Sequence, residues 1–277
     1  MMRIARLSIA PVRSLGLEHP TEAELTKIVV VEDRRFYLID EAGRLVDLLI
    51  ASDLVRVAAH TNADATTLRM TFPDASVVEE EVRLGEPVET AIHGRTGVGH
   101  VVIGPWGDAL EPYAHRRVRV VRCDRAGGTR IANAISLISD GSLRELAQRV
   151  GQDEVDARRF RMLLQIEGAE PHAEDAWIGG EIAVGTAVLS ITKPDARCAI
   201  TTQNPDTGVR DLDTLRTIIA YRGLREGHKA DFGVLGEVEV PGRVAVGDEV
   251  IVTDRTTPPV HLRREPARVR TGSPIPA

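Results

Sequence analysis

The sequence predicts a mainly β protein with a few short helices, built as a barrel or a sandwich rather than as a layered α/β sheet. Short runs of apolar and β-branched residues recur along the chain, and turn-forming Gly, Pro, Asn and Asp residues separate them. Stretches with the periodicity of a helix are few and short. The 277 residues are enough to bury a sizeable core in one large domain or two modest ones.

The first half of the chain holds most of the expected strands. A partly alternating run over residues 4–9 is broken at Pro11, and residues 41–44 are expected to form a hairpin turn. No convincing long amphipathic helix precedes residue 122. The other strands expected here are residues 27–31, 36–39, 45–48, 54–58, 67–72, 88–92, 101–104 and 118–121.

The second half adds helices to the pattern. A candidate capping box at residues 142–145 and apolar residues at helical spacing predict a short helix that ends at Gly151. A second helix is expected from about Asp211 to just before Gly223. Residues 253–277 are rich in Pro and Arg without periodicity and are expected to form a disordered tail. The strands expected here are residues 162–166, 184–191 and 232–240 and, around a turn at 247–248, residues 244–252.

Composition narrows the class of protein. A net charge of −6 argues against nucleic acid as the main partner, because phosphate binding depends on a basic excess. No apolar run approaches the roughly 20 residues that span a bilayer, so no membrane partner is expected. Two cysteines in 277 residues argue against a disulfide scaffold and fit a reducing compartment. We therefore expect a soluble cytoplasmic protein.

The most informative stretch runs from Asp195 to Gly208. It predicts a strand entered near Cys198 and ended by the turn at residues 204–208. A cysteine beside a fixed positive charge, here Arg197, is where an exposed, reactive thiol is most easily built. The alternative is that Cys198 is a small buried hydrophobe. Cys123 also has arginine neighbours, but a loop thiol of this kind is more often incidental.

Three arginines, Arg158, Arg159 and Arg161, crowd one short segment. Such a run is normally a solvated face. Arginine is also the preferred planar group for binding phosphate, so together with Arg13 and Arg34 these residues are equally a candidate anion site.

Several segments together resemble a known family. Their order and spacing are similar to those of the MOSC domain, while Pro11–Leu15 and Asp33–Arg34 resemble the β-barrel domain that precedes it in the mitochondrial amidoxime-reducing component and its bacterial relatives. The resemblance implies an N-terminal β-barrel domain over residues 1–125 and a MOSC domain over 126–252. The segments similar to the MOSC domain are Asp156, Arg159–Arg161, Arg197–Cys198, Thr201–Thr202, Asn204–Gly208, Phe232–Gly233 and Pro241–Asp248.

The resemblance implies that the bound species is the molybdenum cofactor (molybdopterin), a pterin dithiolene with a terminal phosphate. Cys198 would then be the catalytic residue and the protein thiolate on molybdenum, a role that suits a soft sulfur ligand. The cofactor-binding residues implied in the same way are Arg13, Ser14 and Arg34 for the phosphate, Arg161 or Arg159 for the pterin, and Thr201. Thr201 and Asp156 could equally be structural. The broader family has also been linked to pyridoxal phosphate, and nothing in this sequence argues for that ligand in particular.

Three positions depart from the family pattern. Arg13 stands where the family commonly has lysine, which keeps the charge but changes its geometry. Glu32 replaces a glycine and adds a negative charge beside the expected phosphate site. Met162 and Leu163 stand where the family often has Pro-Asn, so one polar contact to the pterin is expected to be absent.

The activity implied by the resemblance is reduction of N-hydroxylated compounds by oxygen-atom transfer at molybdenum. The sequence has no cysteine set for an iron–sulfur cluster, so a separate reductase is the expected electron donor. Two alternatives stay open. One is a sulfur carrier or cofactor-delivery protein that uses Cys198, and the other is a binding module with a vestigial site.

Overall fold

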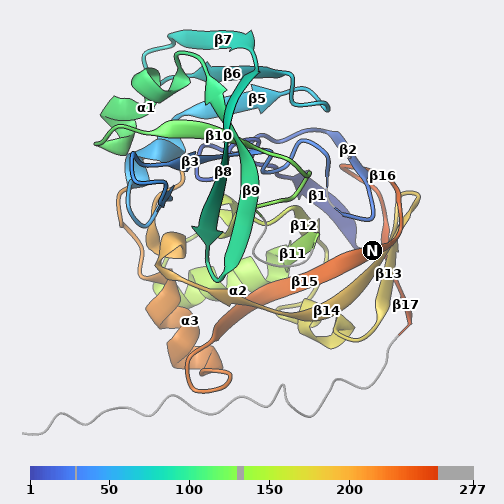
Figure 1. Ribbon diagram of the computed structural model, residues 1–277. Coiled ribbons are helices and arrows are strands. Elements are labelled where there is room, and N and C mark those ends of the chain that lie inside the picture. Colours follow the sequence, from blue (N-terminus) through green and yellow to red (C-terminus); the bar gives the residue numbers. More distant parts are fainter. Residues whose placement is uncertain (29, 130–133, 255–277) are drawn as a thin grey trace, which may run out of the picture.

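The computed structural model describes residues 1–28, 30–129 and 134–254, and it confirms the mainly β prediction (Figure 1). Its largest sheet has seven strands. Their order across the sheet is β1 (Arg3–Leu7), β12 (Leu164–Glu167), β11 (Ile135–Ser139), β15 (Ala230–Val240), β14 (Ala187–Arg197), β13 (Glu181–Val184) and β17 (Val250–Asp254).

This sheet closes on itself. The amide of Ile4 donates to the carbonyl of Asp248 at 2.9 Å, and the amide of Val250 donates to the carbonyl of Met2 at 2.9 Å. These bonds join the first strand of the sheet to the last, so the sheet forms a barrel. Successive side chains of a strand point to opposite faces, and one face of each strand fills the barrel interior. The buried residues there include Ile4, Leu7, Leu137, Leu164, Ile166, Ile182, Leu189, Ile191, Val234, Val238 and Val250.

A second group of strands lies mostly in the first half of the chain. A five-stranded sheet has the order β4 (Leu45–Val46), β3 (Phe36–Ile39), β10 (Arg119–Cys123), β9 (Arg95–Ile103) and β8 (Arg83–Ile92). A three-stranded sheet has the order β5 (Ala58–Thr61), β6 (Thr67–Thr71) and β7 (Val77–Glu81). Helix α1 (Trp106–Ala114) and the 3₁₀-helix η1 (Ser52–Arg56) pack with them around a second core. Trp106 is buried in that core and donates its indole N–H to the carbonyl of Leu68 at 3.1 Å.

The N-terminal segment of the chain pairs at two places with strands of the C-terminal half. β1 at the N-terminal end pairs with β12, and β2 (Glu22–Leu25) pairs with β16 (Gly242–Ala245). The boundary between residues 125 and 126 stays a prediction. The pairing of β1 with β12 shows that the N-terminal segment forms part of the main sheet of the C-terminal half.

Two helices cover one end of the barrel (Figure 1). α2 (Asp140–Val150) and α3 (Thr214–Arg222) pack with Phe160 and Phe232 into a third buried cluster. The short 3₁₀-helices η2 (Ala157–Phe160), η3 (Ala173–Trp177) and η4 (Ala199–Thr202) connect these helices and strands.

The helix ends test the sequence predictions in detail. Gly151 ends α2 with a left-handed φ of 71°, and Gly223 ends α3, as predicted. The start of α2 was wrongly placed, because Ser139 caps the helix by accepting the amide hydrogen of Ser142 at 3.1 Å. α3 starts at Thr214, capped by Asp213, rather than at about Asp211.

Several strand predictions were wrong. The described residues of 27–31 form no strand, whereas β2 lies at residues 22–25. Residues 54–56 belong to η1 because Leu54 and Val57 are both buried at a spacing of three, which suits a 3₁₀ turn rather than a strand. The helix α1 was missed because it contains Gly107 and Pro112, and both residue types have low helix propensity. Its buried side chains Trp106, Leu110 and Ala114 nevertheless follow helical spacing.

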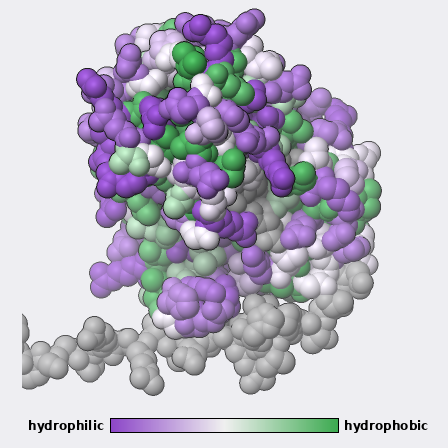
Figure 2. Space-filling model, in the orientation of Figure 1, coloured by the Kyte–Doolittle hydropathy of each residue, from purple (hydrophilic) through white to green (hydrophobic). Residues whose placement is uncertain are grey.

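The predicted tail begins two residues too early, since Thr253 and Asp254 belong to β17. The rest of that prediction, residues 255–277, lies outside the described residues. On the face drawn in Figure 2, hydrophilic residues predominate, and hydrophobic residues lie between them in small groups. Within residues 1–28, 30–129 and 134–254, none of the helices combines the length and the apolar composition needed to cross a membrane.

Candidate functional site

The residues predicted for the site all line one cavity. Its volume is about 960 Å³, open solvent at its mouth included. The residues come from segments that are far apart in the sequence and that the fold brings together. They are Arg13, Ser14, Arg34, Arg159, Arg161, Cys198 and Thr201.

Cys198 is exposed and follows β14 directly. The prediction that a strand is entered here was wrong, because the strand ends at Arg197. Up to that residue the backbone pairs with β15. From Cys198 onward the chain bonds to itself, with the amide of Thr201 donating to the carbonyl of Cys198 at 3.2 Å, so it turns into η4. The thiol is therefore presented at the end of a rigid strand.

The hydroxyl of Thr201 holds this turn. It donates to the carbonyl of Cys198 at 3.1 Å and accepts a hydrogen bond from the hydroxyl of Thr214 at 3.0 Å. Thr201 is buried and lines the cavity, but its hydroxyl is already engaged within the protein. This arrangement favours a positioning role for Thr201, through the backbone that carries Cys198.

Arg197 anchors the same turn from the other side. Its guanidinium donates to the carbonyl of Phe232 at 2.7 Å and to that of Phe160 at 3.1 Å, and it pairs with Asp195 at 3.0 Å. Burial lowers the pKa of Arg197, and the charge of Asp195 partly offsets this effect. These bonds of Arg197 therefore fix the end of β14 against neighbouring segments.

Arg13, Arg34 and Arg161 form the positive wall of the cavity. Burial, with a smaller contribution from the charge of Arg34, lowers the pKa of Arg13 to about 10. Burial and the charge of Arg34 lower the pKa of Arg161 to about 9. Arg34 is paired with the buried Asp33. Because the guanidinium groups repel one another, the cavity holds positive charge that a bound anion would stabilise.

Hydrogen bonds to backbone carbonyls orient the side chains of Arg13 and Arg161. Arg13 donates to the carbonyl of Thr129 at 2.8 Å, and Arg161 donates to that of Leu15 at 2.7 Å. The Nε of Arg13 is buried and has no hydrogen-bond partner within the described protein. A buried donor without a partner is unfavourable, so an oxygen-rich ligand here would satisfy it.

The backbone at three site positions is strained. Ser14, Arg34 and Arg161 have φ angles of 77°, 52° and 52°, in the left-handed region that favours glycine. Each such residue costs on the order of 1 kcal/mol or more. The amide of Arg34 donates to the carbonyl of Ala10 at 2.7 Å, which helps to hold this conformation. Strain of this kind gathers where a fold fixes functional side chains.

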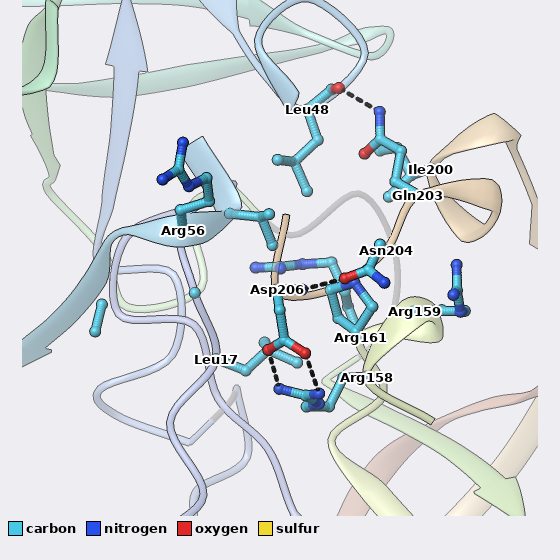
Figure 3. Close-up of a pocket in the computed structure, with 14 residues that line it drawn as sticks. Leu17, Leu48, Arg56, Arg158, Arg159, Arg161, Ile200, Gln203, Asn204 and Asp206 are labelled. Atoms are coloured by element: carbon cyan, nitrogen blue, oxygen red, sulfur yellow. Dashed lines mark hydrogen bonds and ion pairs between the residues drawn. The ribbon is translucent and has the colours of Figure 1, made fainter. Parts of the chain in front are cut away.

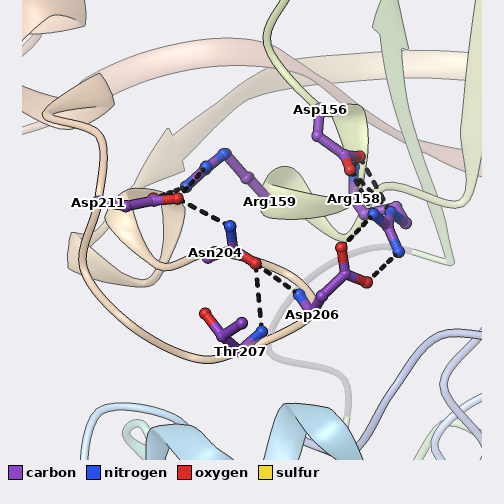
Figure 4. A network of polar contacts seen from close by, with 7 residues as sticks. All are labelled: Asp156, Arg158, Arg159, Asn204, Asp206, Thr207 and Asp211. Atoms are coloured by element: carbon purple, nitrogen blue, oxygen red, sulfur yellow. Dashed lines mark hydrogen bonds and ion pairs between the residues drawn. The ribbon is translucent and has the colours of Figure 1, made fainter.

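The two arginines of η2 are engaged differently (Figure 4). Arg158 lies between Asp156, at 2.6 Å, and Asp206, at 2.7 Å. Its hydrogen bonds to Asp156 and then Asp206 raise its pKa. Arg159 makes two bonds to Asp211, at 2.7 and 3.0 Å. Arg159 therefore lines the cavity while its guanidinium is neutralised, and Asp156 has a structural role.

Residues 204–206 of the turn at 204–208 line a neighbouring cavity of about 700 Å³ (Figure 3). The side-chain oxygen of Asn204 accepts from the amides of Asp206 at 2.9 Å and Thr207 at 3.2 Å. Gly208 has a φ of 76°, and a Cβ there would lie 2.4 Å from the carbonyl oxygen of Ser52, so only glycine lets the turn approach η1 this closely. The residues shared by the two cavities are Leu48, Arg159, Arg161 and Ile200.

The positions at which this sequence departs from the family pattern have different surroundings in the structure. Glu32 lines a different cavity, together with Glu18 and His60. Leu163 is buried in the barrel core, so its side chain cannot reach a ligand in the site cavity, whereas Met162 lines that cavity.

Cys123 is buried, and burial raises its pKa to about 12. Its sulfur lies 3.7 Å from the carbonyl oxygen of Arg34. This unreactive environment agrees with the expectation that it is incidental.

Sequence reasoning missed several residues of the cavity, among them Asp47, Ser136 and Asp195. Asp47 follows the short strand β4 and is buried. No motif or spacing marked it, because only the fold brings it to Arg13. A buried carboxylate beside a cationic site is nevertheless a candidate for chemistry.

Comparison with known proteins places the chain in a family. Residues 90–251 match the model of the MOSC domain, and residues 1–98 match that of the MOSC N-terminal beta barrel domain. The chain belongs to the MOSC domain family. The MOSC match contains Cys198, Arg159 and Arg161, and the N-terminal match contains Arg13 and Arg34. The cavity is therefore shared between the MOSC domain and the segment that precedes it.

The curated relatives of this MOSC protein include mitochondrial proteins. It is 26% identical to "Mitochondrial amidoxime-reducing component 1" of Mus musculus over 89% of this chain and 81% of the relative. It is also 26% identical to the Homo sapiens protein of that name, over 89% and 82% of the two chains. A shorter match, 31% identical over 36% of this chain and 13% of the relative, is to "Molybdenum cofactor sulfurase" of Oryza sativa subsp. japonica.

Proposed function

We propose that this protein is a molybdenum-cofactor-dependent oxidoreductase that reduces N-hydroxylated compounds by oxygen-atom transfer. The observation that carries the proposal is that an exposed thiol, Cys198, opens into the same cavity as the guanidinium groups of Arg13, Arg34 and Arg161. Relatives that match most of the chain are named for amidoxime reduction, which supports the reaction type.

The residues present fit such a cofactor. A terminal phosphate suits Arg13, Ser14 and Arg34, and it would give the buried Nε of Arg13 an acceptor. A thiolate is a suitable ligand for a soft metal, which assigns Cys198 to the molybdenum. Arg161 is the better candidate for the pterin, because the guanidinium of Arg159 is already held by Asp211.

When bound, the cofactor supplies the redox chemistry that removes an oxygen atom from the substrate. The protein fixes the position of one sulfur ligand and the electrostatics around it. Thr201, Thr214 and Arg197 hold the turn that carries Cys198. The Arg159–Asp211 pair ties η2 to the segment after η4. These contacts fix the thiol relative to the cationic wall.

The proposal includes the partners of the reaction. The substrate is a small N-hydroxylated compound, and a separate reductase delivers the electrons. Neither nucleic acid nor a membrane takes part, and the cytoplasmic location stays a prediction. Pyridoxal phosphate is not part of the proposal, because it is held as a Schiff base by lysine and no lysine is among the described residues that line the cavity.

The test compares the wild type with Cys198→Ala, both made in a host that synthesises the cofactor. Elemental analysis gives molybdenum, fluorescence of the oxidised pterin gives cofactor content, and a reduced viologen drives reduction of an amidoxime. We expect near-stoichiometric metal and pterin in the wild type, and loss of metal or of activity in Cys198→Ala. Cys123→Ala is the matched control and keeps both. A well-folded wild type without metal or pterin would overturn the proposal.

The exposure of Cys198 favours one second candidate, a sulfur carrier or cofactor-delivery protein. An exposed thiol can carry a persulfide, whereas a buried one cannot exchange it with a partner. In that case the purified protein holds little metal, and mass spectrometry after incubation with a sulfur donor finds a persulfide on Cys198. Turnover of the amidoxime by metal-loaded protein would exclude it.

A further inference from the structure

Among the described residues, two carboxylates line the site cavity, and they have different partners. Asp195 is paired with Arg197 at 3.0 Å. Asp47 is paired with His93, with 3.2 Å between its Oδ2 and the histidine Nε2. The side chain of Asp47 is 7% exposed and that of His93 is 37% exposed. The pair therefore connects the buried wall of the cavity to the solvent.

The fold places both residues firmly. The Oδ1 of Asp47 accepts from the amide of Leu49 at 3.0 Å, and its carbonyl accepts from the amide of Ile50 at 3.0 Å. These bonds leave Oδ2 to face His93. His93 lies at the tip of the β8–β9 hairpin, which Figure 1 shows extending from the region of β10 toward the level of α2.

The hairpin tip is itself tightly determined. Ile92 pairs with Arg95, so His93 and Gly94 form the whole turn, with φ angles of 47° and 84°. Such a two-residue turn fits the twist of a hairpin and needs positive φ at both positions. Histidine is among the non-glycine residues that adopt positive φ more often than others, so the turn tolerates it. What points to a role for its side chain is the contact with a carboxylate of the cavity.

The proposed reaction consumes protons at the cavity. Reducing an N-hydroxylated compound takes two electrons and two protons, R₂N–OH + 2e⁻ + 2H⁺ → R₂NH + H₂O. The N–O bond breaks, nitrogen is reduced, and the oxygen leaves as water. The separate reductase supplies the electrons. The guanidinium groups of the wall are poor proton donors at neutral pH, whereas histidine exchanges protons readily there.

We propose that His93 and Asp47 form the proton relay of this reaction. The solvent-facing ring nitrogen of His93 takes up a proton, and Nε2–H passes one to Asp47. Asp47 releases it into the cavity, where it reaches the departing oxygen. This inference rests on the proposed function and adds to it the residues that deliver protons.

Other histidine–carboxylate pairs of the described residues lack this connection. His100 pairs with Asp124 at 2.9 Å, and His115 pairs with Asp53 at 3.0 Å. Neither Asp124 nor Asp53 lines the site cavity. His100 lies on β9 of the same hairpin, so it provides a matched control for His93.

The kinetic experiment uses cofactor-loaded Asp47→Asn, His93→Asn and His100→Asn, compared at equal molybdenum content. Asn at position 47 keeps the oxygen that accepts from Leu49, and Asn at position 93 tolerates the positive φ. Positioned proton transfer contributes about 10²- to 10⁴-fold, so we expect kcat to fall about 100-fold in Asp47→Asn and about tenfold in His93→Asn, with KM little changed. Added imidazole restores kcat in His93→Gly, and His100→Asn matches the wild type.

A second readout needs no cofactor. In ¹H–¹⁵N spectra of the cofactor-free protein, we expect the neutral ring of His93 to carry its hydrogen on Nε2, toward Asp47. Asp47→Asn presents an amide donor there, and the hydrogen moves to Nδ1. If the His93–Asp47 pair has only a structural role, the spectra change in the same way but kcat does not fall.

Loaded variants with the wild-type kcat overturn the relay and leave the proposed function intact. A ring that is unaffected by Asp47→Asn overturns it as well. A loaded wild type that reduces no N-hydroxylated compound overturns both proposals.

Discussion

Arg158 and Arg161 lie on the same short segment around η2, yet the groups that surround their charges are opposite in sign. Arg158 is bracketed by Asp156 and Asp206, and these bonds raise its pKa. Arg161 faces Arg34 and Arg13, and burial with their repulsion lowers its pKa to about 9. A neutralised arginine holds the fold together, whereas one whose charge is left unbalanced prepares a place for an anion.

Arg159 stands between these two cases. It is 8% exposed and lines the cavity, but it is paired with Asp211. By this comparison it belongs with Arg158, as part of the support rather than of the binding surface. The same substitution, arginine to methionine, at each of the three positions tests the distinction, because methionine keeps much of the side-chain length and removes the charge.

The largest effect is expected for Arg161→Met. Arg161 is the candidate for the pterin, but its guanidinium lies in the same cavity as Arg13 and Arg34, so inorganic phosphate in the cofactor-free cavity can bind it as well. A hydrogen bond to a charged group contributes about 1.5–3 kcal/mol, so phosphate should bind the cofactor-free variant about tenfold to 100-fold more weakly. The stability to urea should hardly change, because no carboxylate of residues 1–28, 30–129 and 134–254 forms an ion pair with Arg161. Calorimetric titration with phosphate and urea denaturation measure the two quantities. Equal phosphate affinity in Arg161→Met and the wild type would remove Arg161 from the site.

Arg159→Met is expected to show the reverse. The substitution removes the bidentate partner of Asp211. Because the pair is only partly buried, we expect the free energy of unfolding to fall by about 2 kcal/mol, which is less than for a fully buried pair. Phosphate affinity should stay close to the wild-type value. Urea denaturation measures the first quantity and calorimetry the second. A stable variant with weakened phosphate binding would move Arg159 to the binding surface.

The pH dependence of phosphate binding sharpens the comparison further. The pKa of Arg161 is lowered to about 9 and that of Arg13 to about 10, so both are protonated at neutral pH and lose their charge as the pH rises through these values. Phosphate is then bound less well, by about tenfold between about pH 8 and pH 10. The loss should be smaller in Arg161→Met. Calorimetry across this range measures it, and an affinity that rises with pH would contradict the assignment.

The smallest effect is expected for Arg158→Met. Its partner Asp206 is 65% exposed and Arg158 itself is 30% exposed, so water and salt screen the pair. The free energy of unfolding should fall by about 0.5–1 kcal/mol, and by less at high salt. Thermal or urea unfolding at low and high salt measures this, with phosphate affinity unchanged. A change larger than that of Arg159→Met would show that the Asp156–Arg158–Asp206 network is the main support of the turn.

Much of the fold could be predicted from local patterns. The strand at residues 36–39 and the glycines that end α2 and α3 follow from apolar runs and from residues that accept a left-handed backbone. The failures have a common cause. η1 and α1 are held by contacts of Leu54 and Trp106 with residues distant in the sequence, and such contacts override local propensity.

The candidate site was predictable in part. The resemblance named Cys198 and the basic residues, and the structure places them around one cavity. Asp47 and its partner His93 carried no signal, because Asp47 follows β4 and His93 lies in the β8–β9 turn, and the two meet only when that hairpin packs against β4.

By itself, the sequence determined the mainly β class, the likeness to the MOSC domain and the residue types available for chemistry, since these follow from composition, periodicity and short motifs. It did not determine which arginines are free to bind. Arg158, Arg159 and Arg161 look alike in the sequence, and carboxylates between 2 and 52 positions away decide which of them are neutralised. Only the tertiary structure decided this, because the net charge of a site depends on how distant segments are brought together.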